Sequence, residues 1–151
     1  EAIYPDFATL SPDELYRKVV LASIIEGEYR DPSEAPLIAS VFINRLSRRM
    51  ALGSCATVVF VLTEELKKPH PQSLTFKDLE VDSPFNTYKY LGLPPAPISN
   101  PGSVSLSAAF FPAESPYLYF LLKDPDAGRH YFSVSLEEHA RAHTLYIKKA
   151  R

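Results

Sequence analysis

The chain has 151 residues, of which 46% are apolar and 23% are charged, enough apolar sequence to bury the core of one globular domain. Its net charge of −2 gives the chain no general attraction to nucleic acid or to an anionic membrane, so we expect neither as a direct partner. The single cysteine, Cys55, excludes an internal disulfide and any metal site built on paired thiolates. The purely apolar runs, such as residues 19–22, are far shorter than the roughly 20 residues that span a bilayer.

The first half of the sequence predicts helices. Ser11 opens a capping-box pattern completed three residues later, so we expect a helix over residues 12–28. A second helix is expected over 33–49, where apolar residues recur at three-and-four spacing and two arginines end the segment. Residues 57–66 are compatible with a strand or a helix, and we favour a helix.

The second half predicts a proline-rich loop, a short helix, a hairpin and a last helix. Residues 82–102 contain too many prolines for regular structure but too many aromatic and aliphatic residues for a disordered linker, so we expect an ordered irregular loop. We then expect a helix over 103–111, strands over 117–122 and 131–134, and a helix that starts with a capping box at Ser135 and has a basic end at 148–151. The sequence therefore predicts a single α+β domain, residues 1–151, with helices in the majority and a small antiparallel hairpin.

One glutamate of the first predicted helix stands out. Glu26 shares an apolar stripe with Val19 and Ala22, whereas Glu28 lies about 200° further round a regular helix and is expected nearer solvent. A carboxyl on an apolar face loses hydration and gains a raised pKa, as a general acid near neutral pH requires. The alternative is that Glu26 only pairs with Arg45 or caps a loop.

Two histidines raise the question of a metal. His139 and His143 are four residues apart on the last predicted helix, a spacing that can place two imidazoles on one ion. A third ligand is not evident, and zinc sites need three or four. We therefore predict no metal and no cofactor.

Seven segments, in one order along the chain, resemble a known family. They are residues 21–28, 38–46, Met50 with Leu52, 82–88, 92–98, 100–102 and 117–120. In these segments the chain is similar to the YceG-like endolytic murein transglycosylases of the MltG type. The resemblance covers roughly residues 15–146, and it places the family's catalytic acid/base on Glu26.

The resemblance implies a lysozyme-like fold and cleavage of peptidoglycan glycan strands between N-acetylmuramic acid and N-acetylglucosamine. The muramyl C6 hydroxyl attacks its own anomeric carbon, so one carboxyl can act first as acid and then as base and leave an anhydromuramyl end. It also implies action at the extracytoplasmic, periplasmic face of the bacterial inner membrane, with cell-wall synthases as candidate partners. The family's N-terminal membrane anchor and LysM-like domain are not in these 151 residues.

The resemblance also implies a set of substrate-binding residues. Amide, hydroxyl and imidazole groups suit sugar hydroxyls and the charge that develops at the anomeric carbon. For His130 and His139 the alternative is hydrogen bonding between the hairpin and the last helix, and for the loop 82–102 a rigid brace instead of one wall of a sugar groove. The predicted set is Asn44, Ser54, Thr57, Asn86, Thr87, Tyr88, Asn100, His130 and His139.

The sequence departs from the family pattern at one place. The segment that usually reads Ser/Thr-Asp-Pro-Thr reads Ser54-Cys55-Ala56-Thr57, so a cysteine replaces the aspartate. We expect Cys55 to be a small packing residue near the catalytic helix end and not a nucleophile. If this change disables the chemistry, the alternative is a non-catalytic peptidoglycan-binding module. A second alternative, which does not depend on Cys55, is a muramidase-type hydrolase that uses water.

Overall fold

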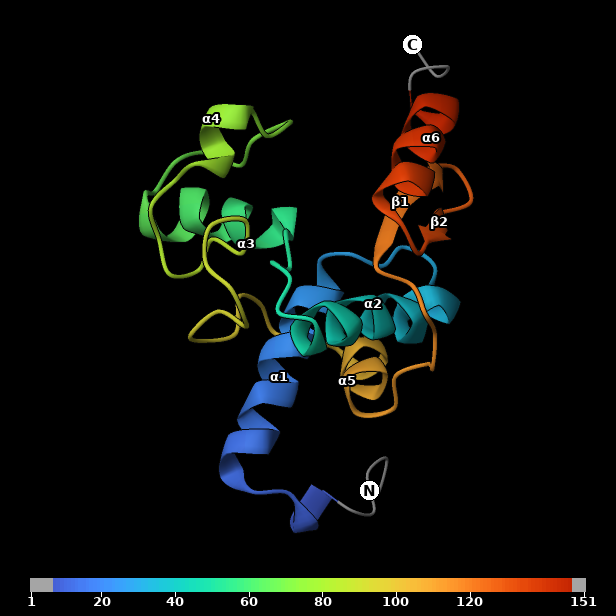
Figure 1. Ribbon diagram of the computed structural model, residues 1–151. Helices are drawn as coiled ribbons and strands as arrows, with labels where there is room; N and C mark the ends of the chain where they lie inside the picture. The colour runs from blue at the N-terminus through green and yellow to red at the C-terminus, as the bar shows by residue number, and fades with distance from the viewer. Residues whose placement is uncertain (1–6, 148–151) are drawn as a thin grey trace.

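The computed structural model describes residues 7–147, which form six α-helices and one two-stranded antiparallel sheet (Figure 1). The α+β class predicted from the sequence is confirmed. The helices are α1 (Pro12–Glu26), α2 (Ala35–Ser47), α3 (Cys55–Phe60), α4 (Phe76–Leu79), α5 (Ser103–Phe110) and α6 (Leu136–Tyr146), and the strands are β1 (Tyr119–Asp124) and β2 (Arg129–Ser133).

The core lies where α1, α2 and α5 meet. Residues 20–25 of α1 are buried all round, and this segment packs with Ile38 and Phe42 of α2 and with Ala108 and Ala109 of α5. The small residues of α5 let its backbone come close to α1. The N-terminal half of α1, by contrast, is exposed.

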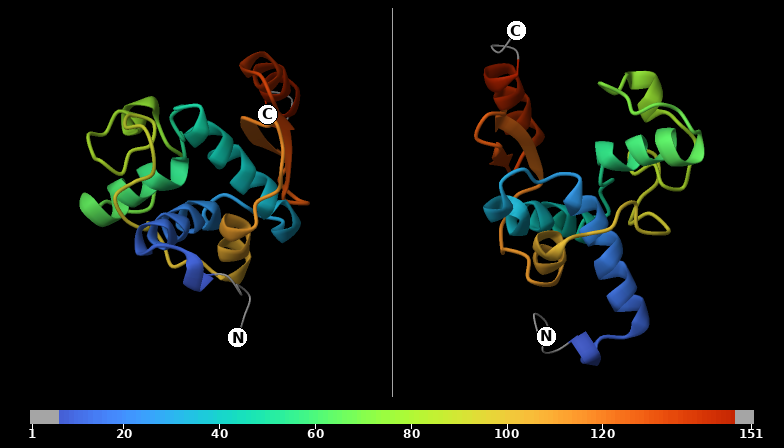
Figure 2. Two further views of the ribbon diagram at one scale, coloured as in Figure 1. Left: turned by 60° about the horizontal axis from the view of Figure 1, so that its bottom comes forward. Right: turned by 180° about the vertical axis from the view of Figure 1, so that it is seen from behind.

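Two arms rise from this core on the same side (Figure 1). One arm holds α3, the π-helical turn Val61–Glu65 that continues it, and α4. The other holds the β1–β2 hairpin with α6 packed on it, and the view from behind shows the same separation (Figure 2). The register pairs Phe120 with Phe132 and Leu122 with His130.

The loop 82–102 is ordered and contains no helix or strand, as predicted. It is held to α1 by several hydrogen bonds: the backbone N–H of Ile98 donates to Ser23 Oγ at 3.0 Å, Ser99 Oγ donates to the Ser23 carbonyl at 2.9 Å, and Tyr16 donates from its hydroxyl to the Pro95 carbonyl at 2.9 Å. The loop runs from the first arm back to the core and ends at the start of α5 (Figure 1).

The helix ends differ from the sequence expectations in physically simple ways. The first helix ends at Glu26 and not at residue 28, because Gly27 follows as its C-cap. The second begins with a 3₁₀ turn at Pro32–Glu34, capped by the Asp31 carboxylate, before α2 itself. Helix α4 was not predicted from the sequence, although Thr75 and Asp78 form a complete capping box there.

The C-terminal elements differ as well. The strands cover residues 119–124 and 129–133 instead of the expected 117–122 and 131–134, so the turn between them is shorter than expected. The predicted capping box at Ser135 is only half formed: Ser135 Oγ accepts from the Glu138 N–H, but the Glu138 carboxylate accepts from the Val134 N–H instead of that of Ser135. The predicted basic end at 148–151 lies outside the described residues.

Candidate functional site

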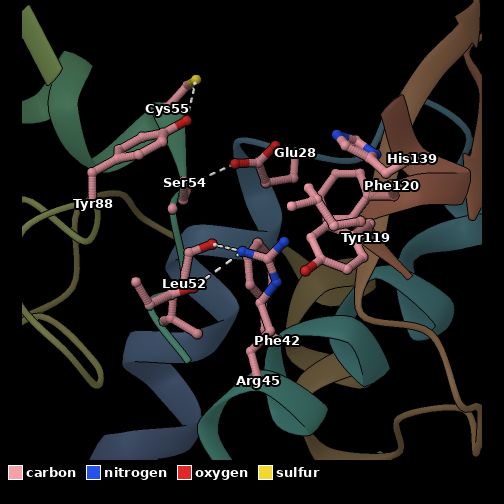
Figure 3. A pocket seen from close by; sticks show the side chains of 13 residues that line it. Glu28, Phe42, Arg45, Leu52, Ser54, Cys55, Tyr88, Tyr119, Phe120 and His139 are labelled. Atoms are coloured by element: carbon pink, nitrogen blue, oxygen red, sulfur yellow. Dashed lines mark hydrogen bonds between the residues drawn. The ribbon is translucent and has the colours of Figure 1, made fainter. Parts of the chain in front are cut away.

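A cleft of about 440 Å³ lies between the two arms, above α1 and α2. Glu28, Phe42 and Arg45 reach it from the core (Figure 3). One wall comes from the loop before α3, the first residue of α3 and the loop 82–102, and the other comes from the hairpin arm with α6. The first wall consists of Ala51, Leu52, Gly53, Ser54, Cys55 and Tyr88, and the second of Tyr119, Phe120, Leu136 and His139.

Glu28 presents the carboxyl group of this cleft. Ser54 Oγ donates a hydrogen bond to Glu28 Oε1 at 2.5 Å (Figure 3). Burial raises the pKa of Glu28 from 4.5 to about 7, and the hydrogen bond from Ser54 offsets only part of that rise. A carboxyl with this pKa exists in both protonation states near neutral pH, so it can give and take a proton.

The position of Glu28 follows from the end of α1. Because α1 stops at Glu26, the angle of 100° per residue no longer applies to Glu28. Glu26 and Glu28 are both partly buried, and it is Glu28 that lines the cleft. Gly27 lies against α3, since a Cβ added there would stand 2.8 Å from the Ala56 Cβ. This contact brings the chain after α1 beside Ser54.

Glu26 has a different environment. Its Oε2 accepts a 3.0 Å hydrogen bond from the backbone N–H of Gly102 and a second, short one from Ser105 Oγ. Gly102 is the N-cap of α5 and Ser105 lies in its first turn, so Glu26 caps α5 from α1. Glu26 is not among the residues that line the cleft, and it does not pair with Arg45.

Arg45 is fixed beneath the cleft. Its Nη1 donates to the carbonyls of Ala51 and Leu52, both at 3.1 Å, and its Nε donates to the Leu118 carbonyl at 2.6 Å. One guanidinium therefore ties the loop before α3 to the residue that leads into β1, and these two segments adjoin the two walls. Its charged plane also lies 5.0 Å from the centre of the Tyr119 ring.

The second wall is aromatic. The rings of Tyr119 and His139 stack with centroids 5.3 Å apart. His139 Nδ1 is buried and has no hydrogen-bond partner among the described residues. Burial, with smaller contributions from Arg45 and His143, lowers the pKa of His139, which favours the neutral ring at neutral pH.

Thr57 and Thr87 hold the first wall in place. Their hydroxyls are 2.8 Å apart, and Thr87 Oγ1 also accepts from the Ser54 N–H at 3.0 Å. Both threonines are buried, with at most 1% of their surface exposed. They therefore position Ser54, which reaches Glu28, and do not line the cleft themselves.

Cys55 lies beside Tyr88 on the same wall. The Cys55 thiol is 3.1 Å from the Tyr88 hydroxyl, and burial, the thiol and Glu28 together raise the pKa of Tyr88. Cys55 is exposed, so the expectation of a packing residue is wrong. The thiol stands at the surface of the cleft.

Three other residues of the predicted set have structural partners. Asn44 donates from its amide to the carbonyls of Ser115 and Tyr117, and Asn86 donates to those of Leu79 and Val81. His130 contacts the buried Glu34 carboxylate through both its backbone N–H and Nδ1, at 3.0 and 2.8 Å. These side chains lie outside the cleft, and so does the exposed Asn100.

Thus the structure brings Ser54, Tyr88 and His139 together around the cleft and places the other members of the set elsewhere. Within residues 7–147, no group of three or more potential metal-binding side chains is found, and no helix is long and apolar enough to cross a membrane.

The YceG-like family matches residues 3–144 of the chain. The chain belongs to the YceG-like family. It is 41% identical over 133 residues to the endolytic murein transglycosylase of Bacillus subtilis strain 168, covering 88% of this chain and 35% of that protein. It is 31% identical over 126 residues to the endolytic murein transglycosylase of Streptococcus pneumoniae strain D39, covering 82% of this chain and 22% of that protein. The chain therefore spans about a third or less of the length of these relatives.

A solved structure agrees with this membership. The 2.6 Å crystal structure of a yceG-like protein from Listeria monocytogenes superposes with a TM-score of 0.76 at 46% identity, over 85% of this chain and 42% of that one. The resemblance read from the seven sequence segments is thus confirmed at the level of family and fold.

Glu28, Arg45 and Tyr119 line this YceG-like cleft but were not predicted from the sequence as site residues. Glu28 had a usable signal, because a glycine directly after a periodic helical segment predicts the helix end and cancels the helical projection beyond it. Arg45 and Tyr119 had no such signal. Their roles depend on backbone carbonyls and ring faces that meet only in the folded chain.

Proposed function

We propose that the chain is the catalytic domain of a peptidoglycan lytic transglycosylase. The reaction is cleavage of the bond between N-acetylmuramic acid and N-acetylglucosamine in a glycan strand, with formation of an anhydromuramyl end. Family membership and the names of the Bacillus and Streptococcus relatives support the reaction class. The cleft between the arms supports a site open enough for an internal stretch of polymer.

The observation that carries the proposal is that Glu28 is the only carboxylate among the described residues that line the cleft. Hydrolases of glycosidic bonds generally use a pair of carboxylates, one on each side of the scissile bond. An intramolecular attack by a substrate hydroxyl needs no second carboxylate to activate water or to form a covalent intermediate. A lone carboxyl with a pKa of about 7 therefore fits a lytic transglycosylase better than a hydrolase.

We assign the acid/base role to Glu28 and not to Glu26. Protonated Glu28 gives its proton to the glycosidic oxygen as the bond to the anomeric carbon breaks. The resulting carboxylate then takes the proton of the muramyl C6 hydroxyl as that oxygen bonds to the same carbon. Ser54 holds the Glu28 carboxyl throughout, through its 2.5 Å hydrogen bond. Glu26, the residue predicted from the sequence, is already bound at the start of α5.

The remaining cleft residues bind and orient the strand in this proposal. The Tyr119–His139 stack and the partly exposed ring of Tyr88 offer aromatic faces on which pyranose rings can lie. Their placement on opposite walls suits a saccharide that crosses above Glu28 (Figure 3). The proposed setting is the extracytoplasmic side of the inner membrane, with cell-wall synthases as candidate partners.

The test is to incubate the chain with purified glycan strands and to determine the masses of the products. Anhydromuramyl ends support the proposal. Reducing muramyl ends would identify a hydrolase, and intact strands that co-sediment with the protein would identify a binding module. The Glu28→Gln variant is the matched control, because it preserves the shape of the site and removes the titratable proton.

A further inference from the structure

A second cleft adjoins the first. Its volume is about 490 Å³, and it lies on the other side of the start of α3. Cys55, the first residue of α3, lines both clefts, so the two meet at this residue. A polymer bound over Glu28 therefore passes close to the entrance of the second cleft.

The lining of the second cleft differs chemically from that of the first. Part of the lining is aliphatic and aromatic. It consists of Val59 and Phe60 of α3 and Ile98 of the loop 82–102. Arg30 supplies a cation, and no acidic side chain of residues 7–147 lies within 4.0 Å of it to form an ion pair. Glu64 adds a carboxylate, whose one ion-pair partner among residues 7–147 is the solvent-exposed Lys67 at 3.8 Å.

We propose that this second cleft binds the stem peptide of the muramyl residue that occupies the first cleft. The inference rests on the proposed function. A stem peptide branches from the muramyl sugar and carries alkyl side chains, carboxylates and an amino group. The apolar wall suits the alkyl groups, and the unpaired guanidinium of Arg30 suits a carboxylate. A further stretch of glycan, polar along its edges, would leave the apolar wall without a partner.

Arg30 offers a clean variant. A Cβ built at Gly128 would stand 2.9 Å from the Arg30 Cβ, so the Cβ of Arg30 packs against the hairpin turn. Arg30→Ala keeps that Cβ and removes only the guanidinium group and the methylene groups that carry it. Arg48→Ala is the matched control, since Arg48 is an exposed arginine at the end of α2 that lines neither cleft.

The experiment measures protection of Cys55 from alkylation, which a mass shift reports unambiguously because the chain has one cysteine. The probes are N-acetylmuramyl tetrapeptide and N-acetylmuramic acid, neither of which has a scissile glycosidic bond. We expect half-protection by the tetrapeptide at about tenfold lower concentration than by the sugar alone. Arg30→Ala should abolish that difference, and Arg48→Ala should retain it. Equal protection by both probes, or a difference that survives Arg30→Ala, would overturn the proposal.

A second measurement separates this inference from the proposed function. The ratio of kcat/KM for peptide-bearing strands to kcat/KM for amidase-stripped strands should fall about tenfold in Arg30→Ala. If neither strand is cleaved by the unmodified chain, the proposed function fails, and the protection of Cys55 still decides whether the second cleft binds the peptide.

Discussion

Glu26 and Glu28 are separated by a single glycine, yet their carboxylates bind different parts of the structure: Glu26 accepts from the Gly102 N–H at the start of α5, and Glu28 accepts from Ser54 Oγ in the cleft. The first contact joins two core helices, and the second belongs to the candidate active site. Substitutions at the two positions should therefore have separable consequences.

Glu28→Gln should reduce strand cleavage by about 100- to 10,000-fold, because the substitution removes the only proposed proton donor and acceptor. The measurement is the rate of anhydromuramyl product formation, with circular dichroism to verify folding. Glu26→Gln is the comparison: loss of a charged cap of α5 should cost about 1 kcal/mol of stability and leave cleavage by the folded protein within a few-fold. An inactive, folded Glu26→Gln beside an active Glu28→Gln would return the acid/base role to Glu26.

The rate of cleavage should depend on pH in the direction set by Glu28. The proposed first step needs protonated Glu28, whose pKa is raised by burial to about 7, so kcat/KM should fall as the pH rises through 7. A pH series on purified strands checks this limb. A rate that stays constant from pH 6 to pH 9 would show that Glu28 is not the proton donor.

The free energy of unfolding should also depend on pH through Glu28. The folded-state pKa of Glu28, about 7, lies above its usual value of 4.5, so the folded protein binds the proton more tightly than the unfolded chain does. The contribution of Glu28 to the free energy of unfolding is fully present below pH 4.5 and is lost as the pH rises through 7. The loss amounts to up to about 3 kcal/mol. Glu28→Gln should therefore be stabilising relative to the unmodified chain above pH 7, as measured by urea unfolding at pH 5 and pH 8.

Asn86→Ala should destabilise the fold by about 2 kcal/mol, because it leaves the partly buried carbonyls of Leu79 and Val81 and the Tyr88 N–H without partners. The exposed Asn100→Ala should change the unfolding midpoint very little. Thermal unfolding of the two variants checks the pair. A direct sugar-binding role for Asn86 would instead give a folded variant of normal stability with impaired cleavage.

Cys55→Asp should move the alkaline limb of the cleavage rate to higher pH. A carboxylate at this position adds a negative charge to the cleft that holds Glu28, and a like charge raises the pKa of a carboxyl group. Cys55→Ser, which keeps a neutral hydrogen-bonding group near the Tyr88 hydroxyl, should leave the limb in place. Identical pH profiles for the two variants would show that position 55 has no electrostatic influence on the proton donor.

The sequence by itself determined the family, the α+β class and most of the helices. These follow from patterns that are local, such as the capping box at Ser11 and the apolar run 20–25, or from ordered motifs that need no coordinates. The proline-rich loop was likewise predictable, because proline restricts the backbone wherever the chain leads. The helical stripe and the family resemblance singled out Glu26, whereas the cleft is lined by Glu28.

Only the tertiary structure decided which carboxylate lies in the cleft and which groups surround it. Glu28 gains its raised pKa from burial beside Ser54, 26 residues away, and Arg45 joins the walls through carbonyls up to 73 residues away. Desolvation and hydrogen bonding at such separations depend on how the arms pack on the core. The periodicity of a single helix carries no information about that packing, and it ceases to apply where α1 ends at Glu26.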